Sequence, residues 1–230
     1  MSRMAAVAAL AQRGRFTVLA ILMLTVLLCA GSIRDIGLRE LIVHSTFSVL
    51  LLLTMWGVGP RLRIVTAALG LSALISLWTL HLFATHVSRV VGFALTCAFL
   101  ALLTVIVLLA VLRGQRVTAD TIVGALCVYL LFGLTWGNAY ALIDLVTPNA
   151  FLVAPDLAQA ADWGSPTSPI MPLLQYFSFV TLSTLGYGDI TPLAPFARSL
   201  AVFEAMAGQL YVAVLIARLV GIHTAAGQRQ

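Results

Sequence analysis

Lysine is absent from this 230-residue chain, and charged residues of every kind amount to only 9% of it. Soluble domains carry about 25% charged residues, whereas 61% of this chain is hydrophobic. An integral membrane protein is therefore predicted, with no room for a large soluble domain beside its spans. The net charge of +5 does not indicate nucleic-acid binding, because arginine placement in a membrane protein reflects its topology.

Only three cysteines occur, Cys29, Cys97 and Cys127, and each lies within an apolar stretch. Their spacing fits no metal site, and free cysteine in such surroundings behaves as a small hydrophobe, so a packing role is predicted. No nucleophile–base pair is apparent, and Asp189 and Glu204 are not obviously paired. Neither catalysis nor a cofactor is expected.

Six apolar stretches are long enough to cross a membrane, which takes about 20 mostly apolar residues. They are residues 16–33, 41–58, 62–83, 90–112, 118–143 and 196–220. Residues 170–182 are apolar but too few to cross, and they read as a re-entrant pore helix. The predicted fold class is an all-α membrane protein with six transmembrane helices, a re-entrant pore helix and a loop before the last helix.

The first stretch has one feature of a secretory signal peptide, because Arg13 and Arg15 precede an apolar run. It is long enough to span, and no Ala-x-Ala sequence closes it, so it is expected to be retained. Arginine counts give the orientation, and nine against four place both termini in the cytoplasm, at a plasma membrane or cell inner membrane. The nine are Arg3, Arg13, Arg15, Arg61, Arg63, Arg113, Arg116, Arg218 and Arg229.

Residues 144–172 hold five of the eight prolines and three aspartates, with no basic residue. An irregular, extracytoplasmic turret is predicted there. Its acidity either raises the local cation concentration or merely keeps a surface loop solvated.

Residues 181–189 read Thr-Leu-Ser-Thr-Leu-Gly-Tyr-Gly-Asp. Gly186 and Gly188 can adopt positive φ without a Cβ clash, so an extended backbone here can turn its carbonyls to one side. Four copies around an axis would stack rings of oxygens that replace the water shell of a potassium ion. Thr184 can add a hydroxyl ring at the inner end, and Asp189 a carboxylate near the outer mouth.

This stretch, with its continuation through residues 190–192, resembles the selectivity filter of potassium channels, which belong to the pore-loop ion channel superfamily. One departure is Leu185, where the family more often has Val or Ile. The resemblance implies passive, potassium-selective conduction through a homotetramer in the lipid bilayer. It places K⁺ at Thr184, Leu185, Gly186 and Tyr187, with Gly188 completing the ion-binding stretch.

The resemblance also assigns roles around the filter. Tyr176 and Phe177 would form an aromatic cuff near Tyr187 of the same or a neighbouring subunit, and Ser183 and Asp189 would support the filter. Gly208 would be the gating hinge of the last helix, unless it is a small residue that permits close packing. Cavity-lining positions on one face of that helix are Gln209, Val212, Ile216 and Val220.

Glu204 lies inside a membrane helix, where a carboxylate is rare and costly, so it should face protein. We expect a hydrogen bond that braces the filter, with the pore-helix backbone, Ser178, Trp136 or Asn138 as partner; a titrating gate residue is the alternative. In the fifth stretch, Gly133 and Gly137 predict a close helix contact, most simply with the sixth stretch.

A voltage sensor needs regularly spaced arginines within one helix, about 3–4 gating charges per subunit, and residues 90–112 contain none. The nearest resemblance is to small bacterial six-helix members of the two-helix-pore "ion channel" family, and it covers residues 118–222 best. Three histidines at the outer side are either proton sensors or interfacial residues: His44, His81 and His86.

The chain is divided into three regions: residues 1–112, a four-helix transmembrane region of unknown role; residues 113–222, the pore domain; and residues 223–230, a short cytoplasmic tail. No nucleic acid partner and no soluble ligand-binding domain are expected. Two rival functions stay open, a weakly selective cation channel and a non-conducting membrane subunit that uses the pore fold as a scaffold.

Overall fold

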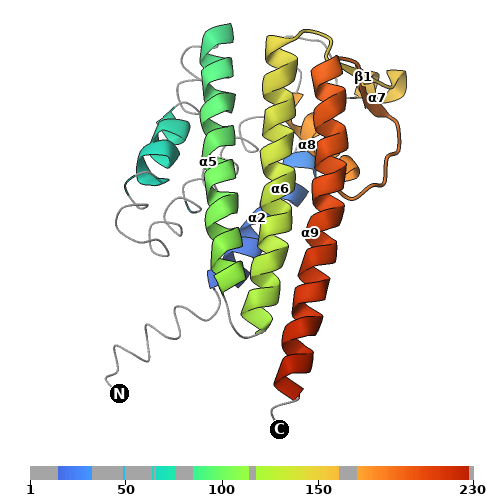
Figure 1. Cartoon of the computed structure of the whole chain (residues 1–230). Coiled ribbons are helices and arrows are strands. Elements are labelled where there is room, and N and C mark those ends of the chain that lie inside the picture. The colour runs from blue at the N-terminus through green and yellow to red at the C-terminus, as the bar shows by residue number, and fades with distance from the viewer. Residues whose placement is uncertain are drawn as a thin grey trace.

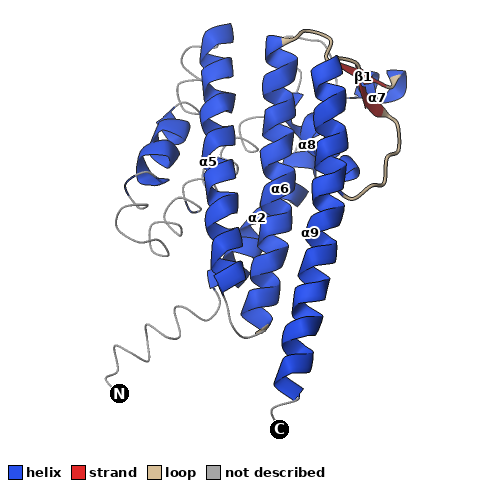
Figure 2. Cartoon of the chain, in the orientation of Figure 1, coloured by secondary structure: helices blue, strands red, loops and turns tan. Residues whose placement is uncertain are grey.

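The computed structural model describes residues 15–32, 49, 64, 66–75, 85–113, 118–160 and 170–227. The described chain is mostly helical, with one short pair of strands (Figures 1 and 2). Its labelled helices are α2 (Arg15–Ser32), α5 (His86–Arg113), α6 (Ala119–Val146), α7 (Pro155–Ala160), α8 (Ile170–Leu182) and α9 (Pro195–Gly227), and Thr66–Ile75 is a further short helix. The strands are β1 (Phe151–Val153) and β2 (Ile190–Pro192).

Three of the described helices are long and apolar enough to cross a membrane: α5, α6 and the Pro195–Arg218 part of α9. They stand side by side in Figure 1. Helix α2 coincides with the first predicted span, at residues 16–33. The predicted spans at 41–58 and 62–83 lie largely outside the described residues, so a total of six spans remains a prediction.

Helix α5 packs along α6 through small polar side chains as well as apolar ones. Thr104 Oγ1 lies 3.3 Å from Thr135 Oγ1, and Cys97 Sγ lies 3.8 Å from the Thr135 carbonyl. On another side of α6, Cys127 Sγ lies 3.3 Å from the carbonyl of Phe16 in α2. Cys97 and Cys127 are free thiols within this packing, which agrees with the role predicted for them.

Helix α6 has a defined start and end. Thr118 is its N-cap, and the side-chain oxygen accepts a hydrogen bond of 3.2 Å from the amide of Thr121, which satisfies one of the amides that a helix leaves unpaired. At the other end the amide of Thr147 donates to the Ile143 carbonyl at 2.7 Å. His86, at the start of α5, places Nε2 2.9 Å from the Leu145 carbonyl near this end.

The short helix α8 has the bounds predicted for a pore helix and packs against α6. The expected partner of Gly133 and Gly137 was wrong: these glycines face α8, not α9. A Cβ on Gly133 would overlap the ring of Phe179, and one on Gly137 would lie 2.7 Å from the amide of Gln175. The absence of side chains on this face of α6 lets the re-entrant helix approach its backbone closely.

The turret is more regular than predicted, because it contains β1 and α7. Strand β1 pairs antiparallel with β2, with Leu152 opposite Thr191. Phe151 and Val153 are buried whereas Leu152 is exposed, so the alternation of a half-buried strand fixes the register. The turret thus holds the segment that follows residues 181–189.

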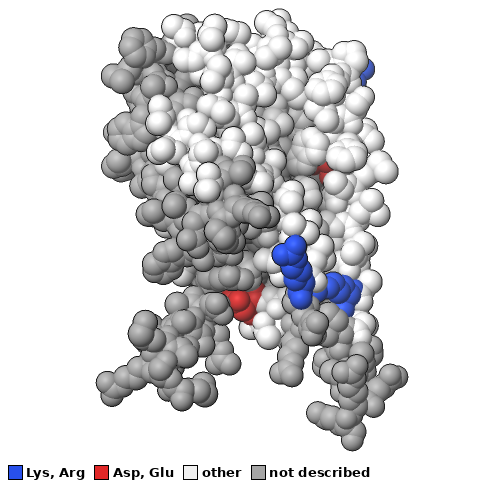
Figure 3. All heavy atoms as spheres, turned by 60° about the vertical axis from the view of Figure 1, so that its left-hand side comes forward, with Lys and Arg blue, Asp and Glu red and all other residues white. Residues whose placement is uncertain are grey.

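The described surface carries few charges. Among the described residues on the face shown in Figure 3, charged side chains are few and lie mainly toward its lower part. Large apolar side chains are exposed along α9, among them Phe203 (60%), Met206 (58%) and Leu210 (61%). A helix with such a surface is suited to lipid or to a neighbouring apolar helix, not to water.

Candidate ion-conduction site

The loop from Ser183 to Asp189 leaves the end of α8 and leads into β2. Its first amides are bonded back to the helix: the amide of Leu185 donates to the Val180 carbonyl at 2.9 Å, and that of Thr184 to the Thr181 carbonyl at 3.0 Å. The Ser183 hydroxyl donates to the Phe179 carbonyl at 2.6 Å. These bonds satisfy carbonyls that a helix end would otherwise leave unpaired, and they fix the start of the loop.

Every second residue of the loop has a positive φ. The values are 59° at Thr184, 56° at Gly186 and 78° at Gly188. The sequence predicted this conformation for the two glycines but not for Thr184, a β-branched residue for which positive φ is unusual. Alternation of left-handed and ordinary residues turns successive carbonyls to one side, which is what rings of carbonyl ligands require.

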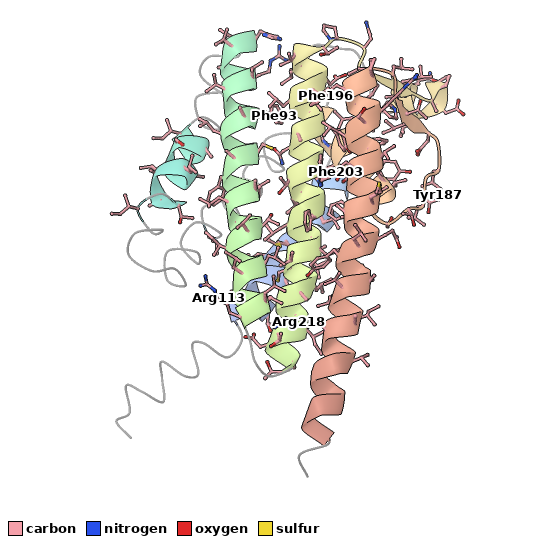
Figure 4. All side chains as sticks on the ribbon, in the orientation of Figure 1. Phe93, Arg113, Tyr187, Phe196, Phe203 and Arg218 are labelled. Atoms are coloured by element: carbon pink, nitrogen blue, oxygen red, sulfur yellow. The ribbon has the colours of Figure 1, made fainter. Side chains whose placement is uncertain are left out.

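The loop is uncovered in a single chain. Leu185 is 58% exposed and Tyr187 66% exposed. No described atom lies within 4 Å of a Cβ built on Gly186 or Gly188. Figure 4 shows Tyr187 on the loop beside α9, at the outer edge of the chain. Among the described residues, no element covers this regular stretch of backbone.

Asp189 connects three elements behind the loop. Its Oδ2 accepts a hydrogen bond of 2.6 Å from the hydroxyl of Tyr176 in α8, and its Oδ1 accepts one of 3.0 Å from the amide of Ile190. The Asp189 carbonyl accepts another, of 2.7 Å, from the amide of Ala154 in the turret. Hydrogen bonds to an ionised carboxylate are the stronger ones, so Asp189 ties the outer end of the loop firmly.

Phe177 occupies a different place from its neighbour Tyr176. Within the described part of the chain, its ring contacts are with Tyr140 (centroids 5.1 Å apart) and Phe151 (5.4 Å), not with Tyr187. This aromatic cluster joins α6, α8 and β1 behind the loop. Tyr176 lies at the loop through its hydrogen bond to Asp189, and the cuff around Tyr187 stays a prediction.

Glu204 is completely buried where α6, α8 and α9 meet. The hydroxyl of Tyr140 donates to Oε2 at 2.7 Å, and Ser178 Oγ lies 2.6 Å from Oε1. Ser178 was among the expected partners. Trp136 and Asn138 were expected too, but the Asn138 amide donates to the Leu134 carbonyl.

Tyr140 was missed as a partner of Glu204, although a signal was available. It lies on α6 at a spacing of three and seven residues from Gly137 and Gly133, which places all three positions on one helical face. The same face receives α8, because the Gln175 amide donates to the Gly133 carbonyl at 2.7 Å.

Gly208 packs against the end of the pore helix. A Cβ at this buried position would lie 2.5 Å from the Leu182 carbonyl oxygen, so the observation supports the alternative of close packing. Helix α9 runs without interruption through it, from Pro195 to Gly227. The hinge role remains a prediction.

The side chains expected to line the cavity begin directly below the loop. Gln209 Nε2 donates to the Thr184 hydroxyl at 3.3 Å. Val212, Ile216 and Val220 follow along α9, and their side chains are 38%, 56% and 56% exposed in the single chain. These positions therefore stay available to an ion pathway.

Two residues of α9 contact neighbouring helices in a way that the sequence did not predict. The Tyr211 hydroxyl donates to the Ala125 carbonyl of α6 at 2.7 Å. Arg218 donates to the carbonyls of Val111 and Leu112 at the end of α5, at 2.9 and 2.8 Å, and Figure 4 shows it beside the lower ends of these helices. A basic residue beside the last turn of a helix is a recognisable pattern, but its partner helix is not readable from sequence.

Comparison with known proteins bears on this same region. Residues 174–224, from within α8 through the loop to α9, match the family model described as "Ion channel". This is a pore-loop channel family, not an enzyme family, and its members are typically oligomeric. No curated protein and no solved structure matched the chain. The protein is thus a multi-pass membrane protein with an ion channel pore domain.

Proposed function

We propose that this chain is one subunit of a homotetrameric, potassium-selective channel whose filter is residues 184–188. The observation that carries the proposal is the alternation of positive φ at Thr184, Gly186 and Gly188 in a loop that the rest of the subunit leaves uncovered. Backbone carbonyls aimed at one axis can replace the hydration shell of K⁺. K⁺ would be held at residues 184–187.

Four subunits are needed because one loop cannot encircle an ion. The exposed loop and the exposed apolar side chains of α9 supply surfaces for neighbouring copies. Residues 113–222 would form the pore domain, with both termini in the cytoplasm and the turret outside. The uncovered side chain of Tyr187 would pack against an adjacent subunit.

The proposed pathway is electrostatically suited to a cation. Helix α8 ends next to the loop, and the C-terminal end of a helix carries partial negative charge. The Thr184 hydroxyl forms the inner end of the filter, and Gln209 bonded to it adds a polar group below. Conduction is passive, since no chemical step is involved.

Reconstitution tests this function and separates it from its rivals. Purified protein in liposomes loaded with KCl should release K⁺ down its gradient, whereas liposomes loaded with NaCl should release Na⁺ far more slowly. Protein-free liposomes are the control. Equal release of both ions would favour a weakly selective cation channel, and tetramers without any flux would favour a non-conducting subunit.

Open probability is expected to change little with voltage. Helix α5 carries no arginine between Arg89 and Arg113, and moving one charge across the membrane is worth about 2.3 kcal/mol per 100 mV. Without such charges a steep dependence has no source. Single-channel recording from roughly −100 to +100 mV checks this, and a steep sigmoid equivalent to several elementary charges would show that a sensor was overlooked.

Tyr176→Phe is expected to weaken the filter. It removes the donor to Asp189 Oδ2, a hydrogen bond to a charged group that is worth about 1.5–3 kcal/mol. We expect faster inactivation or reduced selectivity in sustained K⁺ currents. Tyr211→Phe is the matched control, since it removes a hydroxyl bonded to Ala125, away from the filter. Identical currents in the two variants would contradict the support role of Tyr176.

A further inference from the structure

We propose that Glu204 is held in its neutral, protonated form and donates a hydrogen bond to Ser178, so that a chain of hydrogen bonds from α9 through α8 to α6 holds the pore helix behind the filter. The protonation follows from the hydrogen-bond geometry and from the lack of a cationic partner among the described residues. Its effect on conduction rests on the proposed channel function.

Ser178 has fewer hydrogens than its two short contacts require. Its Oγ lies 2.8 Å from the Gly133 carbonyl oxygen and 2.6 Å from Glu204 Oε1. A serine hydroxyl has one proton, a backbone carbonyl only accepts, and an ionised carboxylate only accepts. With Glu204 ionised, Ser178 would face two acceptors with one hydrogen, and one of the two short oxygen–oxygen contacts would have none.

A proton on Oε1 supplies the missing hydrogen. Oε1–H then donates to Ser178 Oγ, and the Ser178 hydroxyl donates to the Gly133 carbonyl. Tyr140 donates to Oε2 at 2.7 Å, which is the carbonyl oxygen of the neutral acid. Every contact in the cluster is then a proper hydrogen bond.

The residues around Glu204 favour the same form. On α6, the titratable side chain that contacts it is that of Tyr140, which donates to Oε2. On α8, the Glu204 carboxyl group contacts Ser178. Tyr176, which is also on α8, is instead hydrogen bonded to Asp189.

No cation reaches the carboxyl group from α9 either. Arg198 donates to the Pro192 carbonyl at 3.0 Å. Glu204 thus has two hydroxyl groups and no arginine as partners among the described residues. An unpaired carboxylate buried at this depth is costly, whereas a neutral acid with both oxygens hydrogen bonded is not.

The proton has a mechanical consequence. Ser178 lies less than two helical turns before Thr184, and its bond to Gly133, together with that of Gln175, fixes α8 on α6. Once Glu204 loses this proton, its carboxylate can only accept hydrogen bonds. The Ser178 hydroxyl must then donate to Glu204, and its hydrogen bond to the Gly133 carbonyl is lost. The stabilisation is present while Glu204 is protonated and is lost as pH rises through its titration, so tetramer stability and sustained current fall at alkaline pH.

Infrared spectroscopy of the reconstituted full chain tests the protonation directly. At neutral pH the wild type should show the carbonyl stretch of a protonated carboxylic acid, and this band should be missing in Glu204→Gln. Asp156→Asn is the control, because Asp156 is exposed on α7 and its change should leave the band in place. A wild-type spectrum without the band at neutral pH overturns the proposal.

Thermal melting of the tetramer against pH supplies a second readout. The wild-type melting temperature should fall as pH rises, together with the infrared band. Glu204→Gln, whose amide can donate to Ser178 and accept from Tyr140, should match the wild type at neutral pH and show a flat profile. A Glu204→Gln melting profile that depends on pH as the wild type does would also overturn the proposal. If this variant fails to assemble, the pH dependence of the wild-type infrared band and melting temperature still tests the protonation of Glu204. If the reconstituted protein shows the infrared band but no K⁺ flux, the channel function is refuted and the protonation of Glu204 is not.

Discussion

Gly186→Ala is expected to abolish potassium selectivity or all current while the protein is still made and inserted. Gly186 has a φ of 56°, and a left-handed conformation costs a residue with a Cβ about 1–2 kcal/mol. Because no described atom lies within 4 Å of the added carbon, the effect within the subunit is conformational and not a clash. In the proposed tetrameric filter, the carbonyl that this torsion would direct toward the ion path turns away in all four subunits at once.

The measurement is K⁺ and Na⁺ release from liposomes, with size-exclusion chromatography to establish assembly. Gly221→Ala serves as control, since it makes the same chemical change at a position of α9 where a Cβ also has no atom within 4 Å and φ is not positive. Selectivity like that of the wild type in Gly186→Ala would mean that residues 184–188 are not the filter.

Gly208→Ala is expected to destabilise the assembled protein and to suppress conduction. Its Cβ would lie 2.5 Å from the carbonyl oxygen of Leu182, and backbone at the end of a helix cannot yield as a flexible side chain can. Helix α9 must then move away from α8, directly below the filter. Overpacking of this kind typically costs about 1–3 kcal/mol, and each subunit would bear it.

Gly221→Ala again gives the comparison, because in α9 it should stabilise the helix by up to about 1 kcal/mol. Thermal melting of the tetramer and single-channel open probability distinguish the two roles of Gly208. Lower stability in Gly208→Ala supports packing against α8. Unchanged stability with altered open probability would contradict the packing account and favour a hinge.

The features that the sequence specified best are those fixed by local backbone requirements. Gly186 and Gly188 have the positive φ that their lack of a Cβ allows, and α8 spans Ile170–Leu182 as predicted. A short apolar stretch before a glycine-rich loop admits few conformations in a membrane, where backbone groups must be satisfied internally. The match of residues 174–224 to an ion channel family covers this same part.

Contacts between distant elements were harder to predict. Helix α6 is apolar nearly all round, so its periodicity does not tell which face meets α8, and the partner of Gly133 and Gly137 was misassigned. Tyr140 and the pairing of β1 with β2 depend on tertiary packing in the same way. Thr184 adopts positive φ where its amide bonds back to the end of α8, which no local propensity indicates.

Selectivity for K⁺ at residues 184–188 is tested most directly by the reversal potential of the purified protein in a planar bilayer with K⁺ on one side and Na⁺ on the other. The account predicts a potential displaced far from zero, toward the value expected when only K⁺ permeates, and this displacement should vanish in Gly186→Ala wherever current remains. A wild-type reversal potential near zero would contradict a potassium-selective filter at residues 184–188.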